Sequence, residues 1–371
     1  MIELPRLGMT DVKRGSRIPC HYWLSIGLPV LLLGYILLRN VFYFKAGLLD
    51  PNFGIIHAAF DFNLWELPWT LLALALVLAF LAAVLSVCRK ALICWCIVYV
   101  FVAGDLFLLR YYVTSVEPER MVVRRVAFKT PKLGRPVRLL HISDIQAGSI
   151  GDYEHRLFKR IELLEPDLIV YTGDFLQLVP PATFEEEWPK LRALFEEVDP
   201  PLGVFAVFGD VEREFYRLSQ EELGPVRMLS SASERIEVGG GALSLHGLSL
   251  FESRDPDWAQ RSLQHWLEAS EEASFKILFG HSPDFALGVG EEPIDLCLAG
   301  HTHGGQVRLP GYGPLVIDSE IPREWARGFR SIGAPFLNVS AGAGSNRFEG
   351  LPPIRFNCPT EMTLIELAPQ S

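Results

Sequence analysis

Five short motifs place aspartate or histidine directly after apolar segments of the chain. In order they read Ser143-Asp144-Ile145-Gln146, Thr172-Gly173-Asp174, Gly209-Asp210-Val211-Glu212, Gly280-His281 and Gly300-His301-Thr302-His303-Gly304-Gly305. Carboxylate oxygens and imidazole nitrogens are ligands that suit Mn, Fe, Zn or Co. Three Asp and three His are too many for one ion, so the motifs predict a site for two divalent metal ions.

A two-metal site is suited to displacement at phosphorus, because one ion generates hydroxide near neutral pH and both stabilise the developing charge. Each motif is also compatible with an ordinary structural role. A Gly-Asp pair after a strand is commonly a turn or a helix N-cap, and a single His281 can be a core or surface residue. The pair His301 and His303 is more specific, since histidines flanked by glycines have no packing role that Leu or Val would not fill better.

The elements that must position these motifs alternate between strands and helices. Amphipathic patterns predict helices at 152–164, 183–198 and 257–273. Short apolar runs predict strands at 137–142, 168–171, 204–208, 242–245, 275–279, 294–299, 336–339 and 362–366. This alternation predicts an α/β domain with a largely buried sheet. Ligands of such sheets bind beyond the carboxyl ends of the strands, which is where the five motifs lie.

Three uncharged runs in the first third of the chain predict transmembrane helices. They cover Tyr22–Leu38, Leu67–Cys88 and Ala91–Gly104, the last continuing past Asp105 to Leu109. A span needs about 20 apolar residues, and aromatic residues flank the runs as an interfacial belt would. The alternatives are buried helices of a soluble protein or, for the first run, a cleaved signal peptide. Leu37-Leu38-Arg39-Asn40 offers no small-residue cleavage site, so we expect an uncleaved span.

The charges that flank these runs disagree about orientation. Four basic residues precede the first run and favour an N-terminus inside, whereas seven follow the third run before residue 136 and favour the C-terminal part inside. The amphipathic stretch Asn40–Glu66 could form a fourth, shallow insertion that would put both ends inside. We expect an integral protein of the cell membrane, the inner one in a Gram-negative cell, with the C-terminal domain facing the cytoplasm.

The composition divides the 371 residues into unlike parts. Residues 1–115 carry nine basic and six acidic residues, a net +3, whereas residues 116–371 carry 25 and 38, a net −13. So acidic a domain excludes nucleic acid as partner, and the six cysteines show no C-x-x-C or zinc-ribbon spacing. We predict a membrane region at 1–115, a basic juxtamembrane linker and first strand at 116–135, and the catalytic domain at 136–371.

Residues 136–368 resemble the calcineurin-like metallophosphoesterase superfamily, whose signature is D-x-H, G-D, G-N-H-D, H and G-H-x-H. The runs Asp295–Pro310 and Leu351–Glu361 are most similar to its membrane-associated bacterial branch of YkuE and YaeI type. The resemblance implies a four-layer αββα sandwich with two mixed sheets, here following an N-terminal transmembrane helical region.

The resemblance also implies a role for each matched residue. Asp144 and His303 match ligands of the first metal, and Asp174 matches the carboxylate that bridges both metals. His281 and His301 match ligands of the second. The full set of predicted metal ligands is Asp144, Gln146, Asp174, Asp210, His281, His301 and His303, with Asp174 and His301 as the catalytic residues.

The motifs depart from the family signature at four positions. Gln146 replaces the His of D-x-H and offers a weaker carbonyl oxygen. Val211 replaces the His of G-N-H-D, which in the family helps to protonate the leaving oxygen, although other branches also lack it. Asp210 replaces a neutral Asn, while Glu212 stands at the Asp of that motif and is expected to orient structure. We therefore expect two divalent ions (Mn, Fe or Zn), one of them weakly bound.

These observations predict a membrane-anchored metallophosphoesterase in which a metal-bridging hydroxide attacks phosphorus. The expected substrate is a phosphodiester or pyrophosphate of an amphiphile, and the resemblance points to a glycolipid precursor such as UDP-2,3-diacylglucosamine in lipid A synthesis. The alternative is a catalytically silent metal-binding receptor or scaffold that keeps the fold. Intact His281, His301 and His303 argue for the enzyme, whereas Gln146 and Val211 argue for the scaffold.

Overall fold

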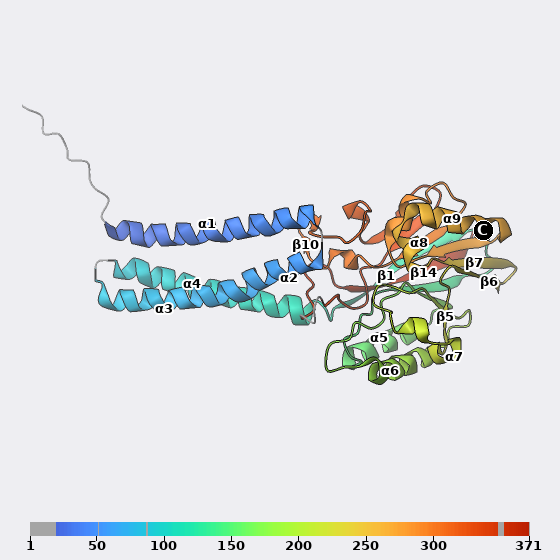
Figure 1. Cartoon of the computed structure of the whole chain (residues 1–371), viewed down its shortest axis with the longest axis horizontal. Coiled ribbons are helices and arrows are strands. Elements are labelled where there is room, and N and C mark those ends of the chain that lie inside the picture. Colours follow the sequence, from blue (N-terminus) through green and yellow to red (C-terminus); the bar gives the residue numbers. More distant parts are fainter. Residues whose placement is uncertain (1–19, 51, 87, 348–351, 371) are drawn as a thin grey trace, which may run out of the picture.

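A computed structural model describes residues 20–50, 52–86, 88–347 and 352–370, with side chains from Ile26 onward. Within these ranges a rod of long helices is attached to one end of an α/β sandwich (Figure 1). The helical elements of the rod are α1 (Cys20–Leu49), α2 (Phe53–Asp61), the π-helical turn η1 (Phe62–Glu66), α3 (Leu67–Val84), α4 (Arg89–Tyr111) and the π-helical turn η2 (Tyr112–Val116).

Three continuous helical stretches of the described chain are long and apolar enough to cross a membrane. They cover Ile26–Leu49, Phe53–Val84 and Arg89–Val116. The stretch Asn40–Glu66 does not form a separate shallow insertion: it supplies the end of α1 and then α2 and η1, which run on into α3. The helices α3 and α4 pack on each other through buried residues such as Leu71, Leu78 and Ala103, whereas the apolar side chains of α1 are largely exposed.

The sandwich contains two mixed six-stranded sheets. The first has the order β1 (Met121–Thr130), β14 (Thr360–Pro369), β2 (Val137–Ile142), β3 (Leu168–Tyr171), β4 (Val204–Ala206) and β5 (Val226–Met228). The second has the order β12 (Gly328–Ser331), β13 (Phe336–Val339), β9 (Leu296–Ala299), β8 (Phe275–Phe279), β7 (Gly241–Gly247) and β6 (Ala232–Val238). A short hairpin, β10 (Arg308–Leu309) and β11 (Gly313–Pro314), lies outside both sheets.

Three of the buried hydrophobic clusters define four layers. Leu139, Phe205 and Ile277 belong to the cluster between the two sheets. The outer face of the first sheet packs on α5 (Asp152–Leu163), α6 (Phe184–Glu196) and α7 (Gln220–Leu223). The outer face of the second packs on α9 (Pro256–Ala269), preceded by the short α8 (Leu250–Arg254). Figure 1 shows these two sets of helices on opposite sides, which confirms the four-layer αββα fold predicted from the sequence.

The predicted strands coincide with observed ones because each is a short apolar run buried on both faces. β2, β3, β8 and β13 have the predicted ends, and β14 is longer than predicted. The strands β5, β6 and β12 were not predicted, because their alternating or polar sequences carry no continuous apolar run. β1 lies within residues 116–135, for which the sequence predicts a linker and a first strand, and pairs with β14 over its whole length, from Met121 against Thr360 to Thr130 against Pro369.

The rod is tied to the sandwich by hydrogen bonds and not by a free linker. The carbonyl of Val113 accepts a bond from the Arg355 amide at 2.9 Å. Glu117, almost fully buried, accepts the Cys358 amide at 3.0 Å and the Tyr112 hydroxyl at 2.5 Å. The predicted boundary at 115/116 therefore falls within a turn that contacts both parts, and the division into units stays a prediction.

Candidate metal centre

The carboxyl ends of five strands bring six Asp and His side chains together. The ends of β2, β3 and β4 in the first sheet lie beside those of β8 and β9 in the second. Two groups of potential metal ligands result among the described residues, each with its ligand atoms within 4.8 Å of one another. One group is Asp144, Asp174 and His303, and the other is Asp210, His281 and His301. The structure thus brings together all six predicted Asp and His residues.

The first group is almost fully buried. His303 Nε2 lies 3.4 Å from Asp144 Oδ1, and Gln146 donates through Nε2 to Asp174 Oδ2 at 2.7 Å. Within the described chain, Gln146 Oε1 and His303 Nδ1 are buried and have no hydrogen-bond partner. A buried polar atom without a partner is costly, so Gln146 Oε1 is suited to hold a cation, while His303 presents Nε2 on the side of Asp144.

The second group is built around the Asp210 carboxylate. His301 Nδ1 lies 2.9 Å from Asp210 Oδ2, and His281 Nε2 lies 3.5 Å from the same oxygen. His281 Nδ1 contacts the Thr172 carbonyl at 2.7 Å. Since a carbonyl can only accept, His281 carries its proton on Nδ1 and presents Nε2 as a ligand, the usual orientation of a metal-binding histidine.

Asp174 lies between the two groups. Its Oδ1 accepts the backbone amides of Asp210 at 2.7 Å and Val211 at 3.2 Å, and lies 3.5 Å from His281 Nε2. Its Oδ2 accepts from Gln146, on the side of the first group. One oxygen therefore faces each group, which is the placement that a bridging carboxylate needs.

The backbone around the site adopts an uncommon conformation. Five of the predicted ligands have positive φ, namely Asp144 (51°), Gln146 (41°), Asp174 (60°), His301 (67°) and His303 (50°). Non-glycine residues rarely adopt this region, and where they do the cost is offset by the surrounding structure, typically at functional sites. Gly209 and Gly300 leave room for it, because a Cβ on them would overlap a carboxylate oxygen of Asp174 and Asp144 respectively.

Burial and mutual contacts shift the ionisation of the site. Burial raises the pKa of Asp144 to about 6, although the His281 charge opposes the shift. Burial also favours neutral Asp210, but hydrogen bonds and charges from His281 and His301 outweigh it and hold the Asp210 pKa well below its usual range. Burial lowers the His303 pKa well below 6.5. Neutral imidazoles and ionised carboxylates are the forms that bind metals.

The donor set fits a pair of divalent cations. Asp174 belongs to the first Asp/His group and lies 3.5 Å from His281 of the second, and the buried Gln146 Oε1 lacks a partner in the described structure. Nitrogen and oxygen donors in this mixture suit Mn, Fe or Zn. Assignment of Asp144, Gln146, Asp174, Asp210, His281, His301 and His303 as the ligands stays a prediction that the geometry supports.

Glu212 is held in a structural position. It is fully buried and accepts the backbone amides of Phe175 and Gly209, so it joins the segments that follow β3 and β4. Burial, followed by the Asp174 charge, raises the Glu212 pKa to about 8. The neighbouring Val211 has an aliphatic side chain, which cannot donate a proton.

Two arginines at the site were not predicted from the sequence. Arg254, at the end of α8, pairs with Asp210. Arg355 is fully buried and donates to the carbonyls of Ala341 at 2.7 Å and Cys358 at 3.0 Å, which fixes the loop that packs on Asp144 and His303. Arg355 is the single basic residue of the run Leu351–Glu361 and stands between the apolar Ile354 and Phe356, a pattern that could have indicated a buried arginine. Nothing in the sequence marked Arg254.

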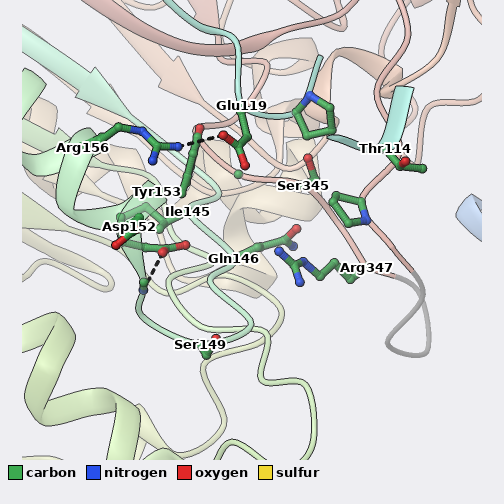
Figure 2. A pocket seen from close by; sticks show the side chains of 15 residues that line it. Thr114, Glu119, Ile145, Gln146, Ser149, Asp152, Tyr153, Arg156, Ser345 and Arg347 are labelled. Carbon is green, nitrogen blue, oxygen red and sulfur yellow. Dashed lines mark hydrogen bonds and ion pairs between the residues drawn. The ribbon is translucent and has the colours of Figure 1, made fainter. Parts of the chain in front are cut away.

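A polar pocket of about 380 Å³ opens beside the first group. Gln146, Tyr153, Arg156 and Arg347 line it (Figure 2). Arg156 pairs with Glu119 at 2.9 Å, whereas Arg347 has no salt-bridge partner in the described structure. The pocket is therefore a polar approach to the candidate metal ligands.

Comparison with known proteins agrees with this fold. The family model described as calcineurin-like phosphoesterase matches residues 137–305. Residues 137–305 therefore form a calcineurin-like phosphoesterase domain, of the class of hydrolases that act on phosphoric esters, as the sequence motifs predict.

Its relatives include several bacterial proteins. The chain is 28% identical over 208 residues to the metallophosphoesterase YkuE of Bacillus subtilis, covering 55% of this chain and 68% of that protein. It is 29% identical over 209 residues to the phosphodiesterase YaeI of Escherichia coli, covering 55% and 71%. A metallophosphoesterase of Aquifex aeolicus is 26% identical over 258 residues, covering 66% and 91%.

Proposed function

We propose that this metal-dependent phosphoesterase is anchored in the membrane and hydrolyses a phosphodiester or pyrophosphate bond of an amphiphilic substrate. The observation that carries the proposal is the placement of Asp174 between two Asp/His groups in a domain joined directly to helices long enough to cross a membrane. The name of the relative YaeI, a phosphodiesterase, supports the diester class. A glycolipid precursor such as UDP-2,3-diacylglucosamine is the specific substrate to test first.

The chain's own residues position the reaction. Asp174 is held by two backbone amides and by Gln146, so its two oxygens stay aimed at the two groups. His281 is held by Thr172. Two divalent ions bound there would lower the pKa of a water molecule and stabilise the charge that develops on the phosphoryl oxygens.

The sandwich that carries the site lies at one end of the helical rod (Figure 1). The proposed orientation has the sandwich in the cytoplasm, where the basic residues after the third span would meet the anionic leaflet. Cysteine accessibility to a membrane-impermeant reagent, with single cysteines placed at Lys159 and at Lys45, tests the side on which each lies.

Hydrolysis of bis(p-nitrophenyl) phosphate by the full chain in detergent, with added Mn²⁺, tests the enzymatic part. We expect turnover that disappears with chelator and returns with metal. UDP-2,3-diacylglucosamine then tests the finer substrate. Binding of metal without turnover of either compound would favour the silent receptor, a role consistent with Val211 replacing the family's proton donor.

A further inference from the structure

An apolar cavity of about 520 Å³ lies where the rod meets the sandwich. Its walls come from α1, from α2 with η1, and from the segment around the β10–β11 hairpin, which Figure 1 shows at the end of α1. Representative lining residues are Phe44, Ala59, Phe60, Val307, Val316 and Ile354. This volume is typical of sites for small molecules, and its lining would hold a hydrocarbon.

The few polar side chains in the wall already have hydrogen-bond partners, because Tyr43 accepts from Arg39 and the two asparagines bond each other. Asn40 and Asn63 exchange hydrogen bonds at 3.0 and 2.8 Å, and each amide also donates to a backbone carbonyl one turn earlier in its own helix. They therefore close one part of the cavity and offer little to a polar ligand. The binding free energy of an occupant therefore comes mainly from the removal of its apolar surface from water, or from the exchange of contacts with lipid for contacts with the protein.

A layer formed by Phe53, which packs with the cavity-lining residues Ile56 and Val316, lies between the cavity and the candidate metal ligands. The Phe53 ring meets the His303 ring edge-on, with centroids 5.9 Å apart. Phe53 and Ile56 form a buried cluster with Val316, and Val307 comes four residues after His303. The same segment thus lines the cavity on one side and supplies a metal ligand on the other.

The cavity is also continuous with the surface that faces lipid. It is bounded by α1, whose apolar side chains are largely exposed along the spanning stretch, with Gly47 buried where α1 meets the sandwich. Gly47 allows α1 to approach the sandwich, since a Cβ there would lie 3.3 Å from Val316 Cγ2. A chain that enters between α1 and α2 from the bilayer can remain in apolar surroundings up to the layer formed by Phe53.

We propose that this cavity binds one hydrocarbon chain of the substrate while its phosphoryl group lies at the Asp/His groups. The inference rests on the proposed function and adds a chain-binding site between α1, α2 and residues 307–316. Each methylene that enters the cavity contributes hydrophobic transfer energy, so kcat/KM rises about two- to fourfold per methylene until the cavity is filled.

The test uses p-nitrophenyl alkyl phosphodiesters with chains of about two to twelve carbons and the full chain with Mn²⁺. Ala59→Trp places an indole in the cavity, whereas Ala58→Trp makes the same change at the neighbouring, exposed position of α2. We expect the wild type and Ala58→Trp to prefer long chains, and Ala59→Trp to treat all chains alike. Hydrolysis of bis(p-nitrophenyl) phosphate, which has no chain, stays unchanged in all three.

A wild type that hydrolyses bis(p-nitrophenyl) phosphate but shows no dependence on chain length would overturn the cavity while leaving the proposed function intact. So would an Ala59→Trp variant that keeps the preference. If no diester is hydrolysed, the proposed function fails, and occupation of the cavity is then tested by photolabelling. A dodecyl phosphonate with a terminal diazirine should then label α2 and residues 307–316 in wild type and Ala58→Trp but not in Ala59→Trp. Labelling confined to the outer faces of α1 and α4 would show bulk lipid only and would overturn the inference.

Discussion

Arg254 Nη2 lies 2.8 Å from both carboxylate oxygens of Asp210. The family signature has a neutral Asn at the position of Asp210, so this chain carries one more negative charge among its predicted ligands and one arginine set against it. Arg254 is half exposed, which limits the strength of the pair. The ion pair nevertheless offsets part of the additional negative charge that Asp210 brings to the ligands of the second metal.

The first prediction concerns this pair. Arg254→Gln leaves the Asp210 charge unopposed and should tighten Mn²⁺ at the second group by about two- to fivefold, the range of a partly exposed ion pair. Asp210→Asn should weaken Mn²⁺ binding at the second group, because the positive charge of Arg254 is then no longer balanced by the Asp210 carboxylate. Calorimetric titration with Mn²⁺ measures both, and the double variant should fall between them. Loss of metal from Arg254→Gln would show that the arginine holds the ligand geometry instead.

The second prediction concerns Asp174. Asp174→Asn keeps the shape of the side chain but removes the charge shared by the two groups, so activity should fall at least about 100-fold and bound metal should decrease. The matched control is Asp318→Asn, an exposed carboxylate 3.8 Å from His301 Nε2, which should retain most activity. Circular dichroism checks that both variants fold. Retained activity in Asp174→Asn would exclude the two-metal mechanism.

The third prediction concerns unequal metal binding. Gln146 offers an amide oxygen where the family has imidazole, so after dialysis the natural chain should keep close to one metal, at the second group, and need added Mn²⁺ for activity. Gln146→His should keep close to two. Three carboxylates facing the ions make a bound water less acidic, so the Gln146→His, Asp210→Asn double variant should have a less alkaline optimum. Elemental analysis measures the metal content, and pH–rate profiles measure the optimum. Two metals retained equally by the natural chain would contradict this prediction.

The fourth prediction concerns His246, which lies away from the metal groups. Its ring stacks on Trp266 and bonds Ser233 at 2.8 Å, and burial lowers its pKa to about 4. Between pH 6.5 and about 4 the unfolded chain therefore binds a proton that the folded chain does not. Stability from this residue is present above pH 6.5 and is lost as the pH falls, by at most about 1.4 kcal/mol per unit.

His246→Phe keeps the stacking on Trp266 but cannot titrate. Urea unfolding in detergent at pH 7 and pH 5, with bound metal kept constant, should show a smaller loss on acidification for this variant than for the natural chain. Equal losses would mean that other groups account for the acid sensitivity.

What the sequence by itself determined is local. The strands β2, β3, β8 and β13 could be located because each is a short, mostly apolar run, and Asp144, Asp174, Asp210 and His281 follow such runs directly. Parallel strands in one sheet end at the same edge, so the meeting of these side chains followed from their position in the chain. The three apolar helical stretches were equally evident, since uncharged runs of about twenty residues are typical of membrane spans and rare in soluble cores.

What only the tertiary structure decided depends on contacts between distant segments. The pairing of Arg254 with Asp210 crosses 44 positions and needs α8 to lie over the end of β4. The burial of Arg355 depends on the loop carbonyls around it, and the pairing of β1 with β14 joins residues about 240 positions apart. The apolar cavity exists because α1 and α2 meet residues 307–316. Such contacts are set by packing between whole elements, which no local periodicity encodes.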